Sequence, residues 1–323
     1  MLIGDPRWVK HPVEVMGYLI ERLQKVLEFY SQKDPWALRL SGFLIALILI
    51  STSGSFGWLI ERLALNGPNT SRLIGSIILI ISGASILASK SLIKSIFAVL
   101  DHIESTTIQS DLIVARKNLS YIVSRNVQNL KREEILRATA ETASENSVDG
   151  IFAPLFWMIV GAFLWQISTQ LPGPLAFGWM YKASSTMDSM LGYKHGSLFW
   201  LGTIPAKLED CMTWIPTRLV LITLPLVCNI SWKSKIKYIK LAYKDGKVYD
   251  SPNAGISEGI FSYCSGIKMG GENIYENIRV SKPILSINNN YPDKEGVKNI
   301  IKYTLRLLFL WILFISLVGI ILL

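Results

Sequence analysis

Residues 42–60 read GFLIALILISTSGSFGWLI, and this apolar run is close to the roughly 20 residues with which an α-helix crosses the hydrocarbon core of a bilayer. A second run, LIGSIILIISGASILAS at 73–89, follows a short polar loop, so the two predict a transmembrane hairpin over 42–89. The C-terminal run LRLLFLWILFISLVGIILL at 305–323 predicts a third crossing. The three runs together predict an all-α, polytopic integral membrane protein.

The composition of the whole chain supports a membrane protein. Of its 323 residues, 50% are hydrophobic and only 18% are charged, and the mean hydropathy of +0.35 lies outside the usual range of soluble domains. The formal net charge of +9 fits basic residues that face anionic lipid. No nucleic-acid-reading motif accompanies that charge, so we expect no nucleic-acid partner. The three cysteines and three histidines lack the spacing of a zinc site or a disulfide framework.

Two further apolar segments, 151–169 and 219–232, are ambiguous as membrane crossings. The first contains Pro154, and the second is short and contains Pro225. Proline inside a helix removes a backbone hydrogen bond and kinks the helix. These segments therefore fit either full crossings or re-entrant helices, which membrane proteins tolerate where they are buried in protein or line a wet cavity.

The distribution of basic residues predicts which side of the membrane each segment faces. The loop 61–72 holds two basic residues, whereas segment 90–150 holds eight and segment 233–304 holds twelve. By the positive-inside rule, both long segments and the N-terminus lie in the cytoplasm. If both ambiguous segments crossed fully, however, the polar stretch 181–218 would be left on the outer face. The re-entrant alternative keeps that stretch in the cytoplasm.

The polar segments differ in their expected structure. Segment 90–136 reads as helical, because apolar residues recur at the helical period at Ile108, Leu112, Ala115 and Leu119. Segment 244–296 is rich in Gly, Pro, Asn and Ser and predicts loops with short helices. At the start of the chain, Pro12 fits the first turn of a mostly apolar, interfacial helix over 12–30.

An acidic stripe stands at the edge of an apolar run in RATAETASENSVDGIFAPLFW, residues 137–157. On a helix, the spacing of four residues places Arg137, Glu141, Glu145 and Asp149 on one face, with Asn146 beside them. Carboxylates on one face repel each other unless a cation is present, and Mg²⁺ or a substrate ammonium group would suit them. The alternative is a solvated helix face that Arg137 partly neutralises.

Two other stretches combine acidic and basic residues. In YKASSTMDSMLGYKHG, residues 181–196, Asp188 lies between Lys182 and Lys194, which suits phosphate held with its metal, although a buried Asp that only fixes packing is the alternative. In AKLEDCMTWIPTRLV, residues 206–220, Asp210 and Arg218 lie on one helical face. The Arg218 guanidinium can grip phosphate or carboxylate, but beside Trp214 it also fits ordinary interfacial anchoring.

The remaining polar candidates lie in turn-forming segments. The loop KDGKVYDSPNAGISEG, residues 244–259, carries Ser251 and Asn253 among small residues that let a backbone approach a ligand, although a connecting loop has the same composition. The N-terminal stretch GDPRWVKHPV offers Asp5, Arg7 and His11, of which His11 alone also fits a helix cap.

Five ordered motifs in this chain resemble the adenosylcobinamide-phosphate synthase family of cobalamin biosynthesis. The resemblance spans most of the chain, and ENSVDG and SPNAG are its most specific cores; the motifs are GDPRWVKHPV, ATAETASENSVDGIFAPLFW, YKASSTMDSMLGYK, AKLEDCMTWIPTRL and DSPNAGISEG. The chain has Arg125-Asn126 where that family commonly has Arg-Asp. It has Lys207-Leu208-Glu209-Asp210 where Arg-Leu-Asp-Asp is common, which keeps the charge but loses a bidentate grip.

The resemblance implies a membrane-bound ligase that joins adenosylcobyric acid to (R)-1-amino-2-propanol O-phosphate, or to free aminopropanol, through a new amide bond. Activation of a carboxylate implies ATP and Mg²⁺. The family also implies a multi-pass protein of the cell membrane with a cytoplasmic active site and with other membrane enzymes of the cobalamin pathway as candidate partners. We accordingly expect one membrane-embedded catalytic domain over 1–323, made of an interfacial helix (12–30), the hairpin (42–89), a cytoplasmic helical segment (90–150), a re-entrant motif region (151–232), a cytoplasmic loop segment (233–304) and a last crossing (305–323).

The resemblance also selects candidate residues, to which we assign roles by chemistry. The acidic stripe could hold the metal, with Glu145 and Asp149 as the Mg²⁺ candidates, while Asp188 or Asp210 deprotonates the attacking ammonium group. The expected catalytic residues are Glu141, Glu145, Asp149, Asp188 and Asp210. The expected substrate-binding residues are Asp5, Arg7, His11, Asn146, Lys182, Lys194, Arg218, Ser251 and Asn253.

A different class remains open from the residues alone. Carboxylates at the edge of the membrane also fit a non-enzymatic transporter or sensor with an ion or proton path. Inverted repeats with paired broken helices, which are typical of such transporters, are not evident in the sequence. An intramembrane protease would need paired histidines, and the three histidines are far apart.

Overall fold

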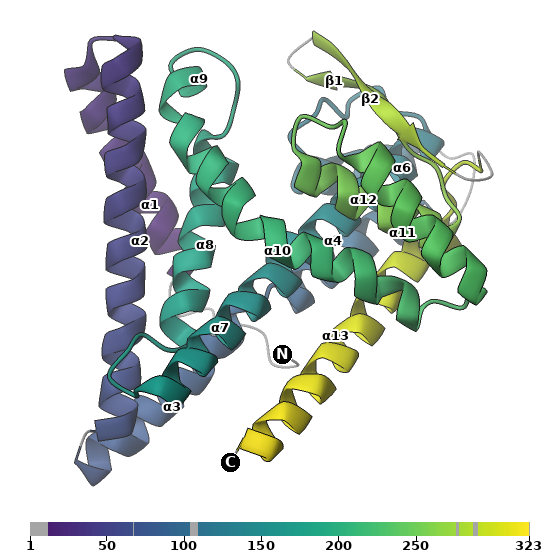
Figure 1. The fold of residues 1–323 in the computed structure, drawn as a ribbon. Helices are drawn as coiled ribbons and strands as arrows, with labels where there is room; N and C mark the ends of the chain where they lie inside the picture. The colour runs from purple at the N-terminus through teal and green to yellow at the C-terminus, as the bar shows by residue number, and fades with distance from the viewer. Residues whose placement is uncertain (1–11, 67, 104–108, 276–277, 287–289, 323) are drawn as a thin grey trace. The chain divides into compact units, whose positions relative to one another are not determined.

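The computed structural model describes residues 12–66, 68–103, 109–275, 278–286 and 290–322, which are mostly helical (Figure 1). Its helices are α1 (Pro12–Ser31), α2 (Pro35–Asn66), α3 (Asn69–Ile86), α4 (Ser89–Leu100), α5 (Gln109–Ser120), α6 (Arg132–Ser147), the π-helix η1 (Val148–Phe152), α7 (Ala153–Ile167), α8 (Pro174–Leu191), α9 (Leu198–Leu201), α10 (Thr203–Val227), α11 (Trp232–Gly246), α12 (Pro252–Ser265) and α13 (Lys294–Leu322). The strands β1 (Met269–Tyr275) and β2 (Ile278–Leu285) form one antiparallel hairpin.

The prediction of an all-α, polytopic membrane protein is confirmed, because five helical stretches are long and apolar enough to span a bilayer. They are Pro35–Asn66, Arg72–Leu100, Arg132–Ile167, Leu198–Val227 and Lys294–Ile320. The three predicted crossings fall within three of these stretches.

The two ambiguous segments belong to the other two long stretches. Segment 151–169 lies where α6 continues through η1 into α7. Pro154 is the second residue of α7, just after the π-helix, whose wider turn accommodates a missing backbone donor. Segment 219–232 looked short in sequence because charged motif residues precede it. In the structure those residues lie on the same helix, α10, which continues past Pro216 and Pro225.

The chain divides into two compact units. The first unit comprises the chain up to Ala88 together with Ala153–Thr213. In its core, Ile20, Leu38, Ile45 and Leu49 of α1 and α2 pack with Leu175, Met187 and Leu191 of α8. A methyl group on Gly57 of α2 would lie 2.6 Å from the Cα of Ala176, so glycine permits the close approach of these two helices.

Helix α8 runs antiparallel to α2 within this unit, beside which it lies in Figure 1. Gly42, early in α2, approaches Leu201, whereas Gly57, late in α2, approaches Ala176 at the start of α8. The turn after α8 lies at the end of α1, because Ser197 Oγ donates to Glu28 Oε1 at 2.6 Å. The chain thus returns through α8 to the end of the unit where α2 begins, a return that the sequence analysis did not foresee.

The opposite end of this unit is held by a buried carboxylate. Glu61 of α2 is 1% exposed and accepts backbone N–H groups at the start of α8, from Gly173 at 2.8 Å, Leu175 at 2.6 Å and Ala176 at 3.2 Å. A helix N-terminus carries partial positive charge, which favours a carboxylate there. Glu61 therefore fixes the turn between α7 and α8 against α2.

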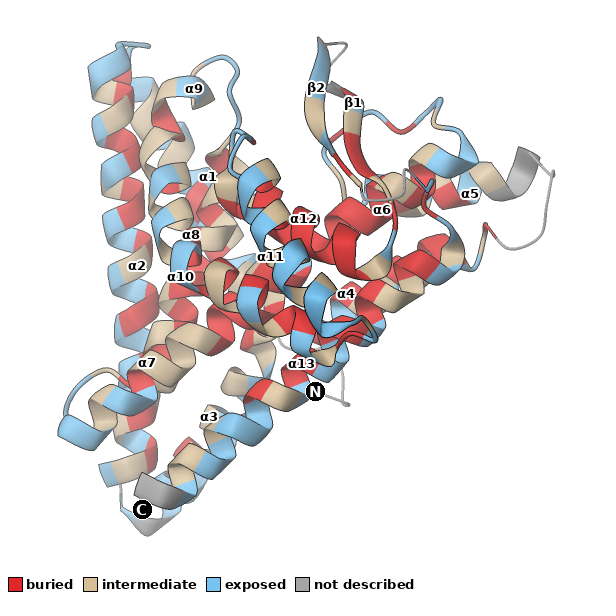
Figure 2. Cartoon of the chain, turned by 45° about the vertical axis from the view of Figure 1, so that its right-hand side comes forward, coloured by how far each residue is buried: buried red, intermediate tan, exposed pale blue. Residues whose placement is uncertain are grey.

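The second unit comprises Ser89–Phe152 and Trp214–Leu323. Helix α6 lies at its centre, packed by α4, α5, α12, α13 and β1, and Figure 2 colours most of α6 as buried. Small side chains make this burial possible, since Ala138, Ala140 and Ala143 are fully enclosed. The ENSVDG motif thus begins on a largely buried helix and continues into η1.

The polar segments only partly follow their expected structure. Helix α1 matches the predicted 12–30, and α4 and α5 fall in segment 90–136, where Ala115 and Leu119 are fully buried, while Ile108 lies outside the described residues. Segment 244–296 was expected to form loops with short helices, but it also forms the β1–β2 hairpin. Strand β1 is irregular: φ is positive at Gly270 and Gly271, and the register shifts between Met269 and Gly271. A bulged strand of this kind does not need the alternation of polar and apolar residues that identifies a regular strand in sequence.

Candidate functional site

The residues of the acidic stripe, which belongs to the second unit, differ in their exposure to solvent. Glu141 is 1% exposed, Glu145 is half-buried and Asn146 is exposed. Asp149 is half-buried in the π-helix η1, a type of turn that often marks functional sites. The stripe therefore runs from the interior of the unit towards its surface.

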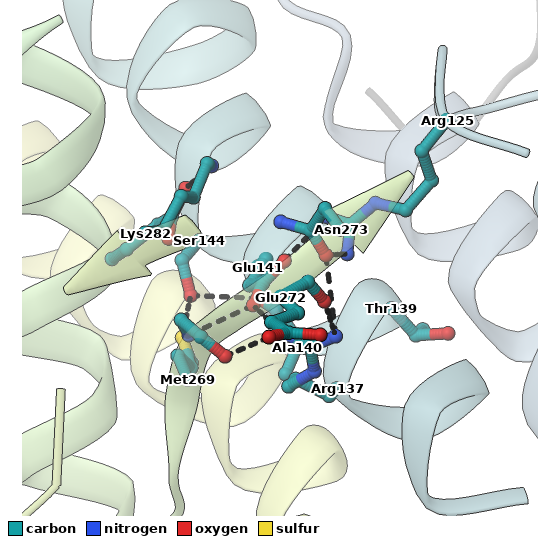
Figure 3. A network of polar contacts seen from close by, with 12 residues as sticks. Arg125, Arg137, Thr139, Ala140, Glu141, Ser144, Met269, Glu272, Asn273 and Lys282 are labelled. Carbon is teal, nitrogen blue, oxygen red and sulfur yellow. Dashed lines mark hydrogen bonds and ion pairs between the residues drawn. The ribbon is translucent and has the colours of Figure 1, made fainter. Parts of the chain in front are cut away.

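Glu141 is the centre of a buried ionic network (Figure 3). Arg125 donates to Glu141 Oε2 and also to Asn273 Oδ1 at 2.6 Å. The backbone N–H of Gly270 in β1 donates to Glu141 Oε1 at 2.9 Å. These contacts tie α6 and the loop that carries Arg125 to the hairpin.

Arg137, one turn before Glu141 on α6, completes the network. Its Nη1 lies 3.5 Å from Glu141 Oε1 and donates to the carbonyl of Gly270, and its Nη2 donates to the carbonyl of Glu272 at 2.7 Å. The charge of Glu141 is thus balanced by Arg125 and Arg137, whereas the sequence analysis offered a metal ion, an ammonium group or, as the alternative, partial neutralisation by Arg137. Two arginines therefore contact the one carboxylate of Glu141.

A second buried carboxylate, Glu258, lies on α12 of the same unit. It is fully buried, and the Lys282 ammonium group lies 3.0 Å from its Oε1. Burial raises the pKa of Glu258 to about 8, with the charges of Glu141 and Glu145 adding to the rise and Lys282 opposing it. Close by, Tyr249 donates to the carbonyl of Pro283 at 3.0 Å, and burial raises the pKa of its hydroxyl.

The structure brings together two predicted residues from different motifs. Arg218 of α10 donates to Asn253 Oδ1, and the Arg218 guanidinium lies 4.7 Å from the ring centre of Trp214. Asn253 is buried in the first turn of α12, and Ser251 caps that helix by accepting the N–H of Ala254 at 3.5 Å. Arg218 therefore takes part both in a contact with the SPNAG motif and in the aromatic contact expected of an interfacial anchor.

The other predicted residues belong to the first unit or lie outside the described residues. Lys182 and Asp188 are half-buried on α8, Lys194 is exposed in the turn after it, and Asp210 is half-buried on α10. Asp5, Arg7 and His11 lie outside the described residues. Next to this group, the buried Tyr181 hydroxyl lies 3.0 Å from Thr213 Oγ1, and Thr213 also donates to Glu209.

Comparison with known proteins identifies the relatives of this chain. The family described as CobD/Cbib protein matches residues 1–304. The chain belongs to the CobD/CbiB family. Family members take part in cobalamin biosynthesis, which confirms the resemblance and the coarse function expected from the five motifs.

Several members of the CobD/CbiB family are similar over most of their length. The chain is 38% identical to the cobalamin biosynthesis protein CobD of Synechocystis sp., over 88% of this chain and 78% of that protein. It is 37% identical to CobD of Clostridium acetobutylicum, over 90% and 85%, and 32% identical to CbiB of Salmonella arizonae, over 87% and 82%. No solved structure matches the chain.

Two carboxylates of this CobD/CbiB protein suit a divalent cation as a pair. Among the residues that the structure describes, no three His, Cys, Asp or Glu side chains are grouped closely enough to hold a metal ion by themselves. Glu145 and Asp149 are one helical turn apart on adjoining helices and are both half-buried. Mg²⁺ commonly uses one or two carboxylates together with water and substrate phosphate, so this pair fits Mg²⁺ that arrives with a phosphate group.

Sequence reasoning missed two buried charged residues of the second unit, Arg125 and Glu258. Arg125 belongs to the Arg125-Asn126 pair, in which only the acidic position differs from the family pattern. Glu258 lies inside the DSPNAGISEG motif. A signal for Glu258 was present, because a carboxylate among Ile, Gly and Phe on α12 needs a partner such as Lys282. The signal for Arg125 was absent, since its partners Glu141 and Asn273 are distant in sequence.

Proposed function

We propose that the chain catalyses ATP-dependent amide formation between adenosylcobyric acid and aminopropanol phosphate or free aminopropanol, giving adenosylcobinamide phosphate or adenosylcobinamide. The observation that carries the proposal is membership of the CobD/CbiB family over residues 1–304. The burial pattern is further support, because Glu145 and Asp149 are half-buried at the end of a largely buried helix.

The reaction needs three tasks from the protein. A carboxylate must be activated, which ATP would supply; the amine must lose the proton of its ammonium form; and negative charge on phosphate must be stabilised. In our assignment Glu145 and Asp149 hold Mg²⁺, and Asp188 or Asp210 accepts the ammonium proton, so that the nitrogen lone pair can attack the carboxyl carbon. Lys182, Lys194 and Arg218 bind phosphate oxygens.

The Glu141 network supports this assignment by fixing the stripe. Glu141 is anchored to Arg125, to Arg137 and to the backbone of β1, and Glu145 follows it by one helical turn. Catalytic geometry depends on supporting contacts that hold the reacting groups in place. Glu141 is therefore given a positioning role here, while Glu145 and Asp149 remain close enough to the surface to meet a ligand.

We also propose that the site faces the cytoplasm. Positive-inside counts place the N-terminus, and hence the start of α2, on that side. Because α8 runs antiparallel to α2, the turn that carries Lys194 lies at the same end as the start of α2. The first unit can thus keep Lys194 in the cytoplasm even when α7 crosses fully, and segment 233–304 stays on the same side if α10 is the segment that does not cross fully.

Paired cysteine labelling tests this sidedness. In a variant without Cys211, Cys228 and Cys264, His195→Cys reports the turn after α8 and Thr169→Cys reports the turn before it; both positions are exposed. We expect an impermeant thiol reagent to label Thr169→Cys in intact cells and His195→Cys only after the cytoplasmic face is opened. Labelling of His195→Cys from outside would refute the proposed orientation.

Mass spectrometry of the product tests the reaction itself. Purified protein would be incubated with adenosylcobyric acid, ATP, Mg²⁺ and either amine, with single omissions as controls. We expect a product whose mass equals the two substrates minus one water, formed only when ATP is present. A protein that is folded and binds the corrinoid but forms no such product with either amine would refute the ligase assignment.

A further inference from the structure

Helix α11 of the second unit and the residue that follows it carry a continuous stripe of lysine side chains. The segment from Trp232 to Val248 contains six lysines and one acidic residue, Asp245. Five of the lysines recur at intervals of four and three residues, which places them along one side of a helix. The five that make up this lysine stripe are all exposed: Lys233, Lys237, Lys240, Lys244 and Lys247. Like charges at this spacing repel one another, so an anionic surface beside the stripe would be favourable.

An apolar stripe lies beside the lysine stripe on the same helix. Its members each come one residue before a lysine of that stripe, and they are Trp232, Ile236, Ile239 and Tyr243. Trp232 is 69% exposed and Ile236 is 58% exposed. Tryptophan and tyrosine are enriched where a bilayer meets water, since their rings are apolar and carry one polar group. Adjoining basic and apolar stripes are typical of a helix that lies in the membrane interface.

The opposite side of α11 packs against α12 (Figure 1). A methyl group on Gly246 would lie 2.5 Å from the carbonyl carbon of Gly255, so glycine permits the close approach of the two helices. Asp245 is directed to α12 as well, because the hydroxyl of Tyr263 donates to its carboxylate at 2.5 Å. Packing against α12 thus fixes α11 with the lysine stripe exposed, and it engages the acidic residue of the segment on the other side of the helix.

Contacts with α13 place the start of α11 at the edge of the membrane. Residues 307–322 of α13 contain no charged side chain, so Arg306 stands where the hydrocarbon-spanning run begins. Arg306 Nη1 donates to the carbonyl of Val227, the last residue of α10, at 3.4 Å. Lys235, early in α11, donates to the neighbouring carbonyl of Leu226 at 3.4 Å. The turn from α10 to α11 therefore lies level with the start of that run, where a bilayer has its headgroups.

A second contact shows on which side of this level α11 lies. Trp311 Nε1, deeper in the apolar run of α13, donates to Thr223 Oγ1 of α10 at 3.2 Å. The last turns of α10 therefore lie beside the apolar part of α13 and reach Arg306 only at Val227. The chain leaves the hydrocarbon at that point, and α11 follows on the headgroup side.

We propose that α11 lies in the membrane interface and binds anionic phospholipid headgroups with its lysine stripe. Lysine carries a compact ammonium group on a flexible apolar stem, so each side chain can reach a headgroup phosphate while the helix stays in place. Trp232 and Ile236 enter the layer between headgroups and acyl chains. An acidic protein would match the charge as well, but it would not require an apolar stripe level with the start of a membrane-spanning run. This contact with lipid does not depend on which reaction the chain catalyses.

Removing charge from the middle of the lysine stripe tests the headgroup contact. The stripe variant carries Lys237→Gln, Lys240→Gln and Lys244→Gln. The control variant loses the same net charge from exposed positions on α1, α4 and α5, through Lys25→Gln, Lys94→Gln and Lys117→Gln. All six side chains are exposed, so the melting temperatures of both variants should match that of the wild type.

Native mass spectrometry measures the lipids that the purified protein binds in neutral detergent. Each protein is mixed with equal amounts of phosphatidylglycerol, which is anionic, and phosphatidylcholine, which has no net charge. We expect the wild type to bind phosphatidylglycerol preferentially. That preference should fall at least about fivefold in the stripe variant, the scale of one lysine near an anionic surface, and stay unchanged in the control variant.

A depth measurement tests whether α11 lies in the interface. In a variant without Cys211, Cys228 and Cys264, Ile236→Cys carries a bimane label, and Phe314→Cys, within the apolar run of α13, is the positive control. Lipids brominated near the headgroup end or near the methyl end of the acyl chain quench a label according to its depth. We expect Ile236→Cys to be quenched more by the first lipid and Phe314→Cys more by the second.

Either measurement can overturn the proposal. A lipid preference that is absent in the wild type, unchanged in the stripe variant or lowered equally in the control variant would show that the lysine stripe is not the binding site. No quenching at Ile236→Cys, with Phe314→Cys quenched, would place α11 away from the bilayer and leave its lysines to a protein partner. Neither measurement involves turnover, so the lipid contact and the amide reaction can fail separately.

Discussion

Glu61 in the first unit and Glu141 in the second are equally buried, at 1% exposure each, but their charges are balanced in different ways. Among the residues that the structure describes, the donors to Glu61 are backbone N–H groups, those of Gly173, Leu175 and Ala176 at the start of α8. Glu141 pairs with Arg125 and Arg137 and accepts the backbone N–H of Gly270.

The difference separates a structural carboxylate from one that supports a site. The donors of Glu61 are backbone groups of one turn. Its contacts therefore fix a helix end and involve no second charged side chain. The partners of Glu141 are side chains whose combined charge exceeds its own, and they lie beside candidate site residues. Burial alone therefore does not mark a functional carboxylate; the identity and charge of its partners do.

The largest effect is expected from Glu141→Gln. The substitution removes the buried carboxylate that both Arg125 and Arg137 contact, and breaking such a pair costs about 3–5 kcal/mol. We expect a large fall in melting temperature and in the amount of folded protein. Glu272→Gln, at an exposed position on β1, is the control. An unchanged melting temperature for Glu141→Gln would show that the network contributes little.

A smaller effect is expected from Glu61→Gln. The amide keeps one acceptor oxygen but points an NH₂ group at backbone donors, which costs about 1–3 kcal/mol. Turnover per folded molecule should stay near the wild-type value, because the contacts of Glu61 reach only the turn before α8. A loss of turnover at full stability would mean that the two glutamates do not differ in role as argued here.

The smallest effect concerns pH. The pKa of Glu258 is raised to about 8, so the folded protein binds its proton more tightly than the unfolded chain does. Stability should therefore fall as pH rises from about 5 to about 8 and then level off. Its charged or titratable neighbours are Lys282, Glu141, Glu145 and Tyr249. Melting temperatures across this range should show a flatter profile for Glu258→Gln, and identical profiles would contradict the shift.

The sequence predicted the membrane fold and most of the motif positions for local reasons. Apolar runs such as 42–60 indicate a membrane-spanning helix by their length alone. The four-residue spacing of Glu141, Glu145 and Asp149 puts them on one face of a helix. The sequence did not show that α8 runs back along α2, because Lys182 and Asp188 lower its hydropathy, while α8 packs against α2 and α7.

The rest depended on contacts between distant residues. The β1–β2 hairpin contains Gly270, Gly271 and Pro283, which conceal a strand pattern. Of the partners of Glu141, only Arg137 on the same helix was visible in the local sequence. Arg125 lies in a loop before α6, and the N–H of Gly270 lies in the hairpin more than a hundred residues later. The predicted roles of the site residues stay predictions, since a role depends on the bound substrates.

The most direct test of the account is the turnover of Glu145→Gln and Asp149→Asn, measured as amide product per folded molecule. Both carboxylates lie at the surface end of the stripe that Glu141 anchors, so neither change should disturb folding. We predict wild-type melting temperatures and a loss of turnover of at least about a hundredfold, the scale of a lost metal ligand or acid–base group. Near-normal turnover in both variants would show that the stripe is not part of the catalytic site.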